Sequence, residues 1–182
     1  MILKIVQVGD PVLREGTAEV DPGRINSPEL QMLLEMMRAT MLDAPGVGLA
    51  APQVGVPLRI TVIEDRAEVI AMMPPELTAA RERRPVPFHV LINPRLTILD
   101  AAAVSFPEGF LSLTGFAAQV ARARAVRVEA LDHNGEPQLI EATGWYARIL
   151  QHEIDHLDGR LYIDRMDTRT FINQHANPGR SA

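Results

Sequence analysis

The sequence predicts an α+β fold in which a mixed or antiparallel sheet packs around a helix near the C-terminus. Apolar residues at helical spacing mark an early helix and a late one, and short β-branched runs lie between them. The pair Asn134-Gly135 separates two of these runs and indicates a hairpin with a two-residue turn, because such turns need positive φ. At least part of the sheet is therefore expected to be antiparallel.

The first helix is predicted over residues 27–42. Ser27 is a suitable N-cap, and Pro28 suits the first helical position. The apolar side chains that follow at intervals of three or four residues are Leu30, Leu33, Leu34, Met37 and Met41. We interpret the methionines of this segment as core side chains rather than as a binding groove.

Four strands are predicted in the middle of the chain. They cover residues 58–64, 88–93, 96–99 and 126–131, and the last of them forms the hairpin with residues 138–140. Residues 65–87 contain prolines and a charged run, which indicate a surface excursion with one helical turn.

The second helix is predicted to start after Thr143, a suitable N-cap, and to end at Leu157, before Gly159. A length of 182 residues suits one compact domain. We assign this domain to residues 1–166 and expect the polar residues 167–182 to form a frayed, flexible tail.

Composition narrows the class of function. The net charge of −5 disfavours proteins that bind nucleic acids or anionic membranes. The chain has no cysteine, so any metal must be held by histidine and carboxylate. The N-terminal apolar run is too short for a signal peptide and no stretch is long enough for a membrane span, so a cytoplasmic location is expected.

The strongest chemical signal is the segment His152-Glu153-Ile154-Asp155-His156. On a helix, its two histidines lie on one face about 6 Å apart and can bind one metal ion. Glu153 can then act as general base toward a water on that metal. The alternative is a chance spacing of two histidines that bond to nearby carboxylates, and we favour the metal site.

Two other segments are less specific. Residues 46–53, Gly-Val-Gly-Leu-Ala-Ala-Pro-Gln, lack the lysine and the spacing of a P-loop. Their small residues let the backbone approach a ligand, and Gln53 offers an amide to an oxyanion, although a tight loop is the simpler interpretation of this segment alone. Residues 107–112, Pro-Glu-Gly-Phe-Leu-Ser, indicate only a turn and a strand.

Together and in this order, the three segments resemble those of the peptide deformylases, over residues 8–165 of the chain. The resemblance implies a metal-dependent α+β enzyme that removes the formyl group from N-formylmethionine at the start of nascent bacterial polypeptides. It implies a divalent metal, Fe²⁺ or Zn²⁺, with Ni²⁺ or Co²⁺ as further candidates. The expected partner is an N-formylmethionyl peptide or another small N-acyl substrate, with no nucleic acid and no membrane. Ribosome contact is expected to be transient at most, because the tail after Arg165 is short and not basic.

The resemblance also implies roles for individual residues. His152 and His156 match the family's metal ligands, and Glu153 matches its general base. Gln53 and the backbone N–H of Leu111 match the groups that stabilise the tetrahedral oxyanion. The residues that match the substrate site are Gly48, a backbone partner of the peptide, and Val47, Trp145 and Ile149, which line the methionine pocket.

The sequence departs from the family at the third metal ligand, a cysteine, where it has Phe110. It also has Ala117 where the resemblance places an arginine paired with Glu108. Losing a thiolate removes one ligand and one negative charge, so metal affinity is expected to fall. Three outcomes are open: Glu108 binds the metal through oxygen, Glu153 binds it and stops acting as base, or the site is empty. An empty site would leave a module that binds formylated amides, or an enzyme for a different small N-acyl compound. Because Gln53 and the histidine helix are present, we favour an enzyme with partly retained machinery.

Overall fold

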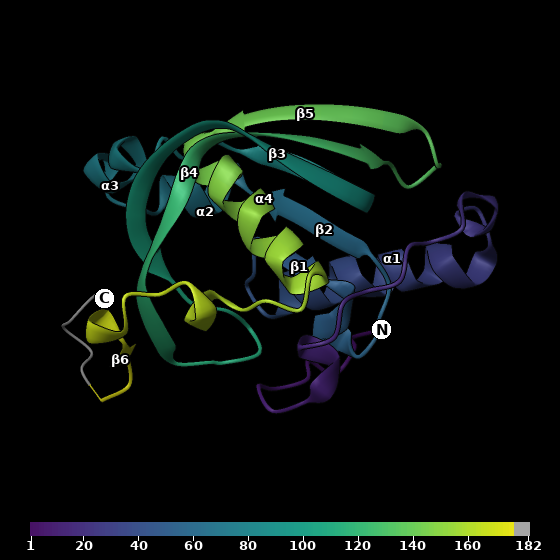
Figure 1. Cartoon of the computed structure of the whole chain (residues 1–182), viewed down its shortest axis with the longest axis horizontal. Coiled ribbons are helices and arrows are strands. Elements are labelled where there is room, and N and C mark those ends of the chain that lie inside the picture. The colour runs from purple at the N-terminus through teal and green to yellow at the C-terminus, as the bar shows by residue number, and fades with distance from the viewer. Residues whose placement is uncertain (177–182) are drawn as a thin grey trace.

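Two long antiparallel strands dominate the computed structural model, which describes residues 1–176 (Figure 1). They are β3 (Val86–Glu108) and β4 (Phe116–Leu131). The sheet order is β1 (Gly48–Ala50), β2 (Ile60–Asp65), β3, β4 and β5 (Pro137–Thr143), and a short β6 (Ile172–Asn173) also pairs with β4. These pairings are all antiparallel, so the predicted α+β fold is confirmed.

Helix α4 (Gly144–Leu157) lies inside the curve that β3 and β4 make (Figure 1). Its fully buried Ala147 and Leu150 pack in one apolar cluster with Val126 and Val128 of β4. Because α4 carries the two histidines, this packing holds them at the centre of the molecule.

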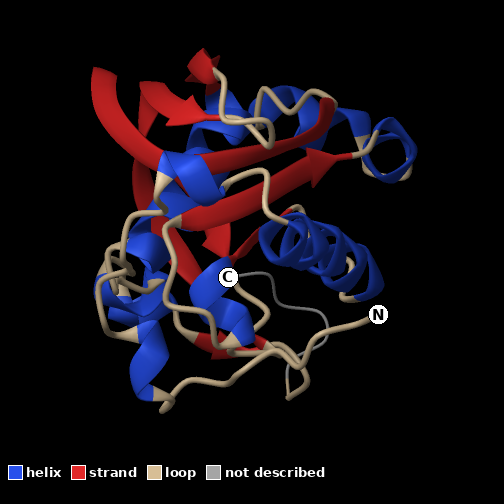
Figure 2. Ribbon diagram, turned by 90° about the vertical axis from the view of Figure 1, so that its right-hand side faces the viewer, coloured by secondary structure: helices blue, strands red, loops and turns tan. Residues whose placement is uncertain are grey.

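Helix α1 (Pro28–Asp43) packs on the part of the sheet that contains β1 and β2. The Leu30 N–H donates to the Ser27 hydroxyl at 3.3 Å, as expected of an N-cap. Met37 and Met41 are fully buried in a cluster with side chains of β1, β2 and β3, which confirms that they are core residues. In Figure 2 the strands run between the helices.

Strands β3 and β4 are longer than predicted, whereas β2 nearly matches the strand predicted at residues 58–64. Residues 88–93 and 96–99 belong to one strand, β3, and the register with β4 shifts between Ile92 and Arg95. Asn93, with φ of 54°, and Pro94 lie at this irregularity. A bulge of this kind bends a strand without ending it, so the proline interrupts the apolar pattern but not the strand.

The predicted hairpin joins β4 to β5, but its turn is longer than two residues. Leu131 pairs with Pro137, which leaves residues 132–136 in the loop. The Asp132 carboxylate accepts the N–H groups of Asn134 and Glu136, at 2.8 and 2.9 Å. This side chain stabilises a wider loop in which Gly135 has positive φ and Asn134 does not.

The excursion at residues 65–87 forms two short helices, α2 (Ala67–Ala71) and α3 (Pro75–Ala80), instead of one turn. Thr143 precedes α4 without a side-chain capping bond, and Gly159, with φ of 71°, follows its end. None of the helices in residues 1–176 is long and apolar enough to cross a membrane.

The predicted tail is paired where the structure describes it. Residues Thr168–Thr170 form a 3-10 turn, and the next residues form β6 against the start of β4. A frayed conformation therefore does not describe residues 167–176. Residues 177–182 of the predicted tail lie outside the described residues.

Candidate active site

The histidines of α4 meet on one face of the helix. The Nε2 atoms of His152 and His156 lie 3.1 Å apart, and their ring planes are nearly perpendicular. His156 is fully buried, and this burial lowers its pKa well below the usual range, so its imidazole is neutral. Two imidazoles with facing nitrogens are suitable donors for a divalent transition metal.

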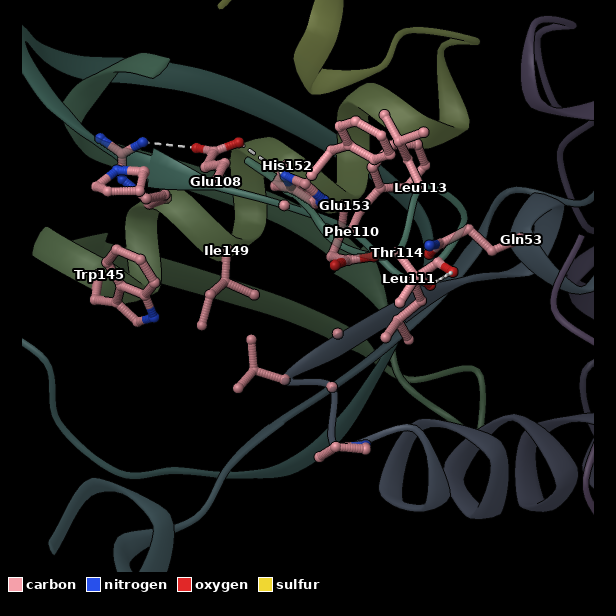
Figure 3. Close-up of a pocket in the computed structure, with 18 of the residues that line it drawn as sticks. Gln53, Glu108, Phe110, Leu111, Leu113, Thr114, Trp145, Ile149, His152 and Glu153 are labelled. Carbon is pink, nitrogen blue, oxygen red and sulfur yellow. Dashed lines mark hydrogen bonds and ion pairs between the residues drawn. The ribbon is translucent and has the colours of Figure 1, made fainter. Parts of the chain in front are cut away.

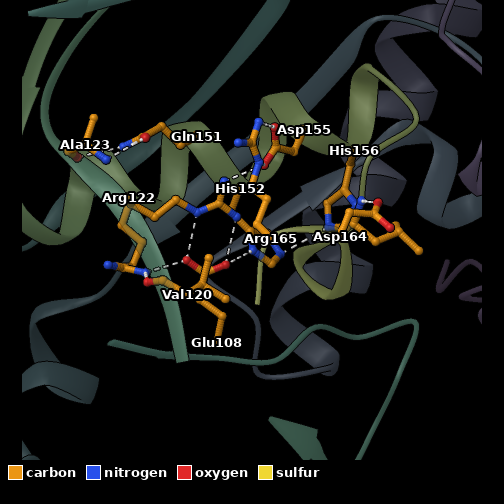
Figure 4. A network of polar contacts seen from close by, with 12 residues as sticks. Glu108, Val120, Arg122, Ala123, Gln151, His152, Asp155, His156, Asp164 and Arg165 are labelled. Carbon is orange, nitrogen blue, oxygen red and sulfur yellow. Dashed lines mark hydrogen bonds and ion pairs between the residues drawn. The ribbon is translucent and has the colours of Figure 1, made fainter. Parts of the chain in front are cut away.

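Glu108 at the end of β3 orients the first histidine (Figure 4). Its Oε2 lies 2.9 Å from His152 Nδ1. Burial alone would raise the pKa of Glu108, but hydrogen bonds from Arg122 and His152 hold it well below its usual range. A carboxylate that accepts the Nδ1–H of a histidine leaves Nε2 free as a metal ligand.

Two arginines also donate hydrogen bonds to the Glu108 carboxylate. Arg122 of β4 makes a bidentate pair with it at 2.8 and 2.9 Å, and Arg148 of α4 bonds to Oε1 at 2.6 Å. The expectation that Ala117 stands at the position of the arginine partner is therefore wrong, because Arg122 fills that role. Glu108 bonds to the Nδ1 atom of His152 and not at the facing Nε2 atoms, so it is not placed as a third ligand. Within residues 1–176 no group of three or more His, Cys, Asp or Glu side chains is placed to hold a metal.

Arg122 also connects Glu108 to the next turn of α4. It forms a second buried ion pair with Asp155, which in turn accepts two hydrogen bonds from Arg165 at 2.7 and 2.8 Å. Figure 4 shows this network spreading from Glu108 to Arg165. Sequence reasoning missed Arg122, Arg148 and Arg165. The available signal was a charged side chain at an inward-facing position of a strand, since Arg122 is only 4% exposed.

Phe110 fills the place next to the two imidazoles. Its ring centroid lies 5.2 Å from that of His156, 6.3 Å from that of His152 and 5.4 Å from that of Tyr162. Two histidine nitrogens are thus available to bind a divalent ion, and the Phe110 ring beside them supplies no third ligand atom.

Glu153 is buried beside the histidines. Its Oε2 accepts the Thr61 hydroxyl at 3.3 Å, and burial raises its pKa to about 7. A Cβ on Gly48 of β1 would collide with the Glu153 carboxylate, so only glycine allows this strand to pass so close. Within residues 1–176, Glu153 makes no hydrogen bond to either histidine, and its Oε1 bonds to no side chain.

Two N–H donors of the described chain are left free at the cavity. Gln53 uses its Oε1 to accept the Ala50 N–H at 2.9 Å, and its NH₂ group makes no hydrogen bond to residues 1–176. The backbone N–H of Leu111 likewise donates to no carbonyl among these residues. Both residues line the same cavity as His152 and Glu153 (Figure 3).

This cavity measures about 380 Å³ and has a mainly apolar end (Figure 3). Val47, Trp145 and Ile149, the residues that the resemblance implied for a methionine pocket, line that end. The Arg81 guanidinium lies 4.4 Å from the Trp145 ring centroid and supports the indole from behind.

Comparison with known proteins agrees with this arrangement. The profile of the polypeptide deformylase family matches residues 2–171. The chain belongs to the peptide deformylase family. It is 51% identical over 174 residues to peptide deformylase 3 of Streptomyces avermitilis, covering 96% of this chain and 75% of that protein. It is 46% identical over 169 residues to the mitochondrial peptide deformylase of Homo sapiens, covering 93% of this chain and 70% of that protein.

Two further comparisons place the chain within the family. It is 49% identical over 167 residues to the chloroplastic peptide deformylase 1A of Solanum lycopersicum, which is 92% of this chain but only 60% of that protein. A class I type b peptide deformylase of Acinetobacter baumannii, solved with Met-Ala-Ser bound, has a TM-score of 0.81 at 32% identity, covering 91% of this chain and 99% of that one. The deformylase fold predicted from the sequence is thereby confirmed.

Proposed function

We propose that this member of the deformylase family hydrolyses the N-formyl group of N-formylmethionyl peptides, with a divalent metal held by His152 and His156. The observation that carries the proposal is the convergence of His152, Glu153 and two free N–H donors on one cavity, with the Nε2 atom of His156 3.1 Å from that of His152. A divalent ion there supplies Lewis acidity and lowers the pKa of water toward neutrality. Fe²⁺, Zn²⁺, Ni²⁺ and Co²⁺ are the ions to test, and we place the protein in the cytoplasm.

Glu153 is the proposed general base. Thr61 binds Oε2, so Oε1 is the atom available to take the proton of the attacking water. A buried carboxyl with a pKa of about 7 can both accept this proton and return it to the amine that leaves. Ionised Glu153 is the form that starts the reaction.

The free donors of Gln53 and Leu111 are the proposed oxyanion site. Negative charge develops on the formyl oxygen as the carbonyl carbon becomes tetrahedral, and N–H groups fixed in advance stabilise it. The bond between Gln53 Oε1 and the Ala50 N–H fixes the orientation of the amide, so its NH₂ group faces the cavity rather than its oxygen.

The apolar end of the cavity is the proposed methionine pocket. Val47, Trp145 and Ile149 form an irregular apolar surface, which suits an unbranched, flexible side chain. Gly48 on β1 offers its backbone to the peptide beside this pocket.

Formate release tests the proposal directly. The purified chain is incubated with formyl-Met-Ala and Fe²⁺, Ni²⁺, Co²⁺ or Zn²⁺, and its metal content is measured in parallel. We expect metal-dependent formate release. Tight metal binding without formate release would support an enzyme for another N-acyl compound, and neither metal nor formate would support a binding module.

A further inference from the structure

Part of the wall of the cavity at the proposed active site is made by the C-terminal segment, residues 171–176. Gln174 lines the cavity there, together with Thr114, Gly115 and Phe116. None of these residues has a role in the proposed chemistry, and Gln174 is remote from the others in the sequence.

Several contacts hold this segment in place. β6 pairs with the first residues of β4, and the Gln174 N–H donates to the Gly115 carbonyl at 2.8 Å. The Phe171 ring stacks on the Phe116 ring, with centroids 5.3 Å apart and planes within 9°. The His175 ring covers Gly115 so closely that a Cβ on this glycine would collide with it. The backbone on both sides of Gln174 is therefore fixed.

The side-chain amide of Gln174 is free. It makes no hydrogen bond to any residue from 1 to 176. Its two N–H donors and its carbonyl oxygen match the hydrogen-bonding groups of a peptide backbone. Gly46 also lines this cavity and has no side chain to obstruct a backbone.

The direction of a bound substrate points to the same wall. A peptide whose methionine side chain enters the pocket at Trp145 and whose formyl group lies at His152 has the rest of the cavity for its downstream residues, and the lining of that cavity includes Thr114 and Gln174. An extended chain advances about 3.3 Å per residue, so the second and third residues of the peptide extend beyond the methionine pocket.

We propose that Gln174 hydrogen-bonds the substrate backbone downstream of N-formylmethionine, so that the C-terminal segment forms the wall that recognises peptide length. This inference rests on the proposed function of the same cavity. Because a backbone contact does not depend on side chains, Gln174 strengthens the binding of peptides of any sequence but not of N-formylmethionine amide.

The first test is Gln174→Leu, which keeps the volume of the side chain and removes its polar atoms. Calorimetry gives the Kd of formyl-Met-Ala-Ser and of N-formylmethionine amide for parent and variant. We expect the variant to bind the tripeptide about three- to tenfold more weakly, the effect of one or two lost hydrogen bonds, and the amide unchanged within about twofold.

A pair of glycine variants provides an independent test. Gly115 and Gly135 have nearly the same positive φ, 84° and 88°, so alanine strains the backbone similarly at both positions. Only at Gly115 does the added Cβ collide with the His175 ring, so only Gly115→Ala displaces His175 and its neighbours. We expect Gly115→Ala to lose the tripeptide preference and Gly135→Ala, at the β4–β5 loop, to keep it.

The outcomes separate this inference from the proposed function. Equal tripeptide binding by the parent and Gln174→Leu overturns the inference, and so does a parent that binds the tripeptide no better than the amide. If the parent binds the tripeptide through Gln174 but releases no formate with any metal, the inference stands and the proposed reaction fails.

Discussion

Replacing Phe110 with cysteine is expected to restore a third metal ligand. The two Nε2 atoms lie 3.1 Å apart. Tetrahedral zinc with Zn–N bonds of about 2.1 Å requires about 3.4 Å between them, so the imidazoles need to move by only about 0.3 Å. Because the Phe110 ring already packs on both imidazoles, a cysteine at the same position starts from a backbone that faces the site. A thiolate there should tighten zinc or iron binding at least tenfold, or about 1.4 kcal/mol.

The same substitution should lower the free energy of unfolding of the metal-free protein. Removing a fully buried phenyl ring costs about 3–5 kcal/mol, and this ring is only half-buried, so we expect about 1–3 kcal/mol. Phe110→Ala makes a similar cavity without adding a ligand and is therefore the matched control.

Competition with a chelator gives metal affinity, and formate release from formyl-Met-Ala gives activity. We expect Phe110→Cys to exceed both Phe110→Ala and the parent in both assays. If the cysteine variant holds metal no more tightly than the alanine variant, position 110 does not face the metal. If it holds metal tightly and releases no more formate, an incomplete ligand set is not what limits the reaction.

Three further substitutions and one matched control test the site and the buried network. Glu153→Gln should abolish formate release and leave the thermal unfolding midpoint within a few degrees of the parent, because the amide keeps the shape but accepts no proton; near-parental turnover would remove the general-base assignment. Trp145→Ala should raise the KM of a formyl-methionyl peptide more than that of a formyl-glycyl peptide, and equal losses would make the indole a core residue only. Arg122→Met should cost about 3–5 kcal/mol in urea unfolding because it leaves two buried carboxylates without their shared partner. Arg127→Met, on the same strand but in an exposed pair with Glu141, should change stability by at most about 1 kcal/mol, and similar losses in both variants would contradict the argument.

The sequence predicted those features that depend only on residues close to one another along the chain. The shared face of His152 and His156 follows from the helical period alone, and the N-cap at Ser27 follows from one side chain and its neighbours. The charge network could not be predicted in this way, because Glu108 and Arg122 meet only after β3 folds back on β4. Without knowledge of that pairing, no local pattern favours Arg122 over Ala117 as the position that faces Glu108.

The length of β3 and the path of the C-terminal segment also depend on distant contacts. Pro94 ends an apolar run in the sequence, yet the bulge beside it lets the strand continue because β4 supplies partners beyond it. Residues 167–176 are polar and lack a periodic pattern, so nothing local distinguishes them from an unpaired tail. Their strand exists because Phe116 and its neighbour offer a free edge.

The position of Arg122 ties the opening of the active site to the unfolding of the whole molecule. This side chain, on β4, bonds at once to the end of β3 and to α4. Moving any one of the three elements away would break a buried ion pair of Arg122 in a low-dielectric interior, so small local openings are strongly disfavoured. The amide protons of α4 around His152 should therefore exchange with solvent only through global unfolding, and the spacing of the two imidazoles persists for as long as the protein stays folded.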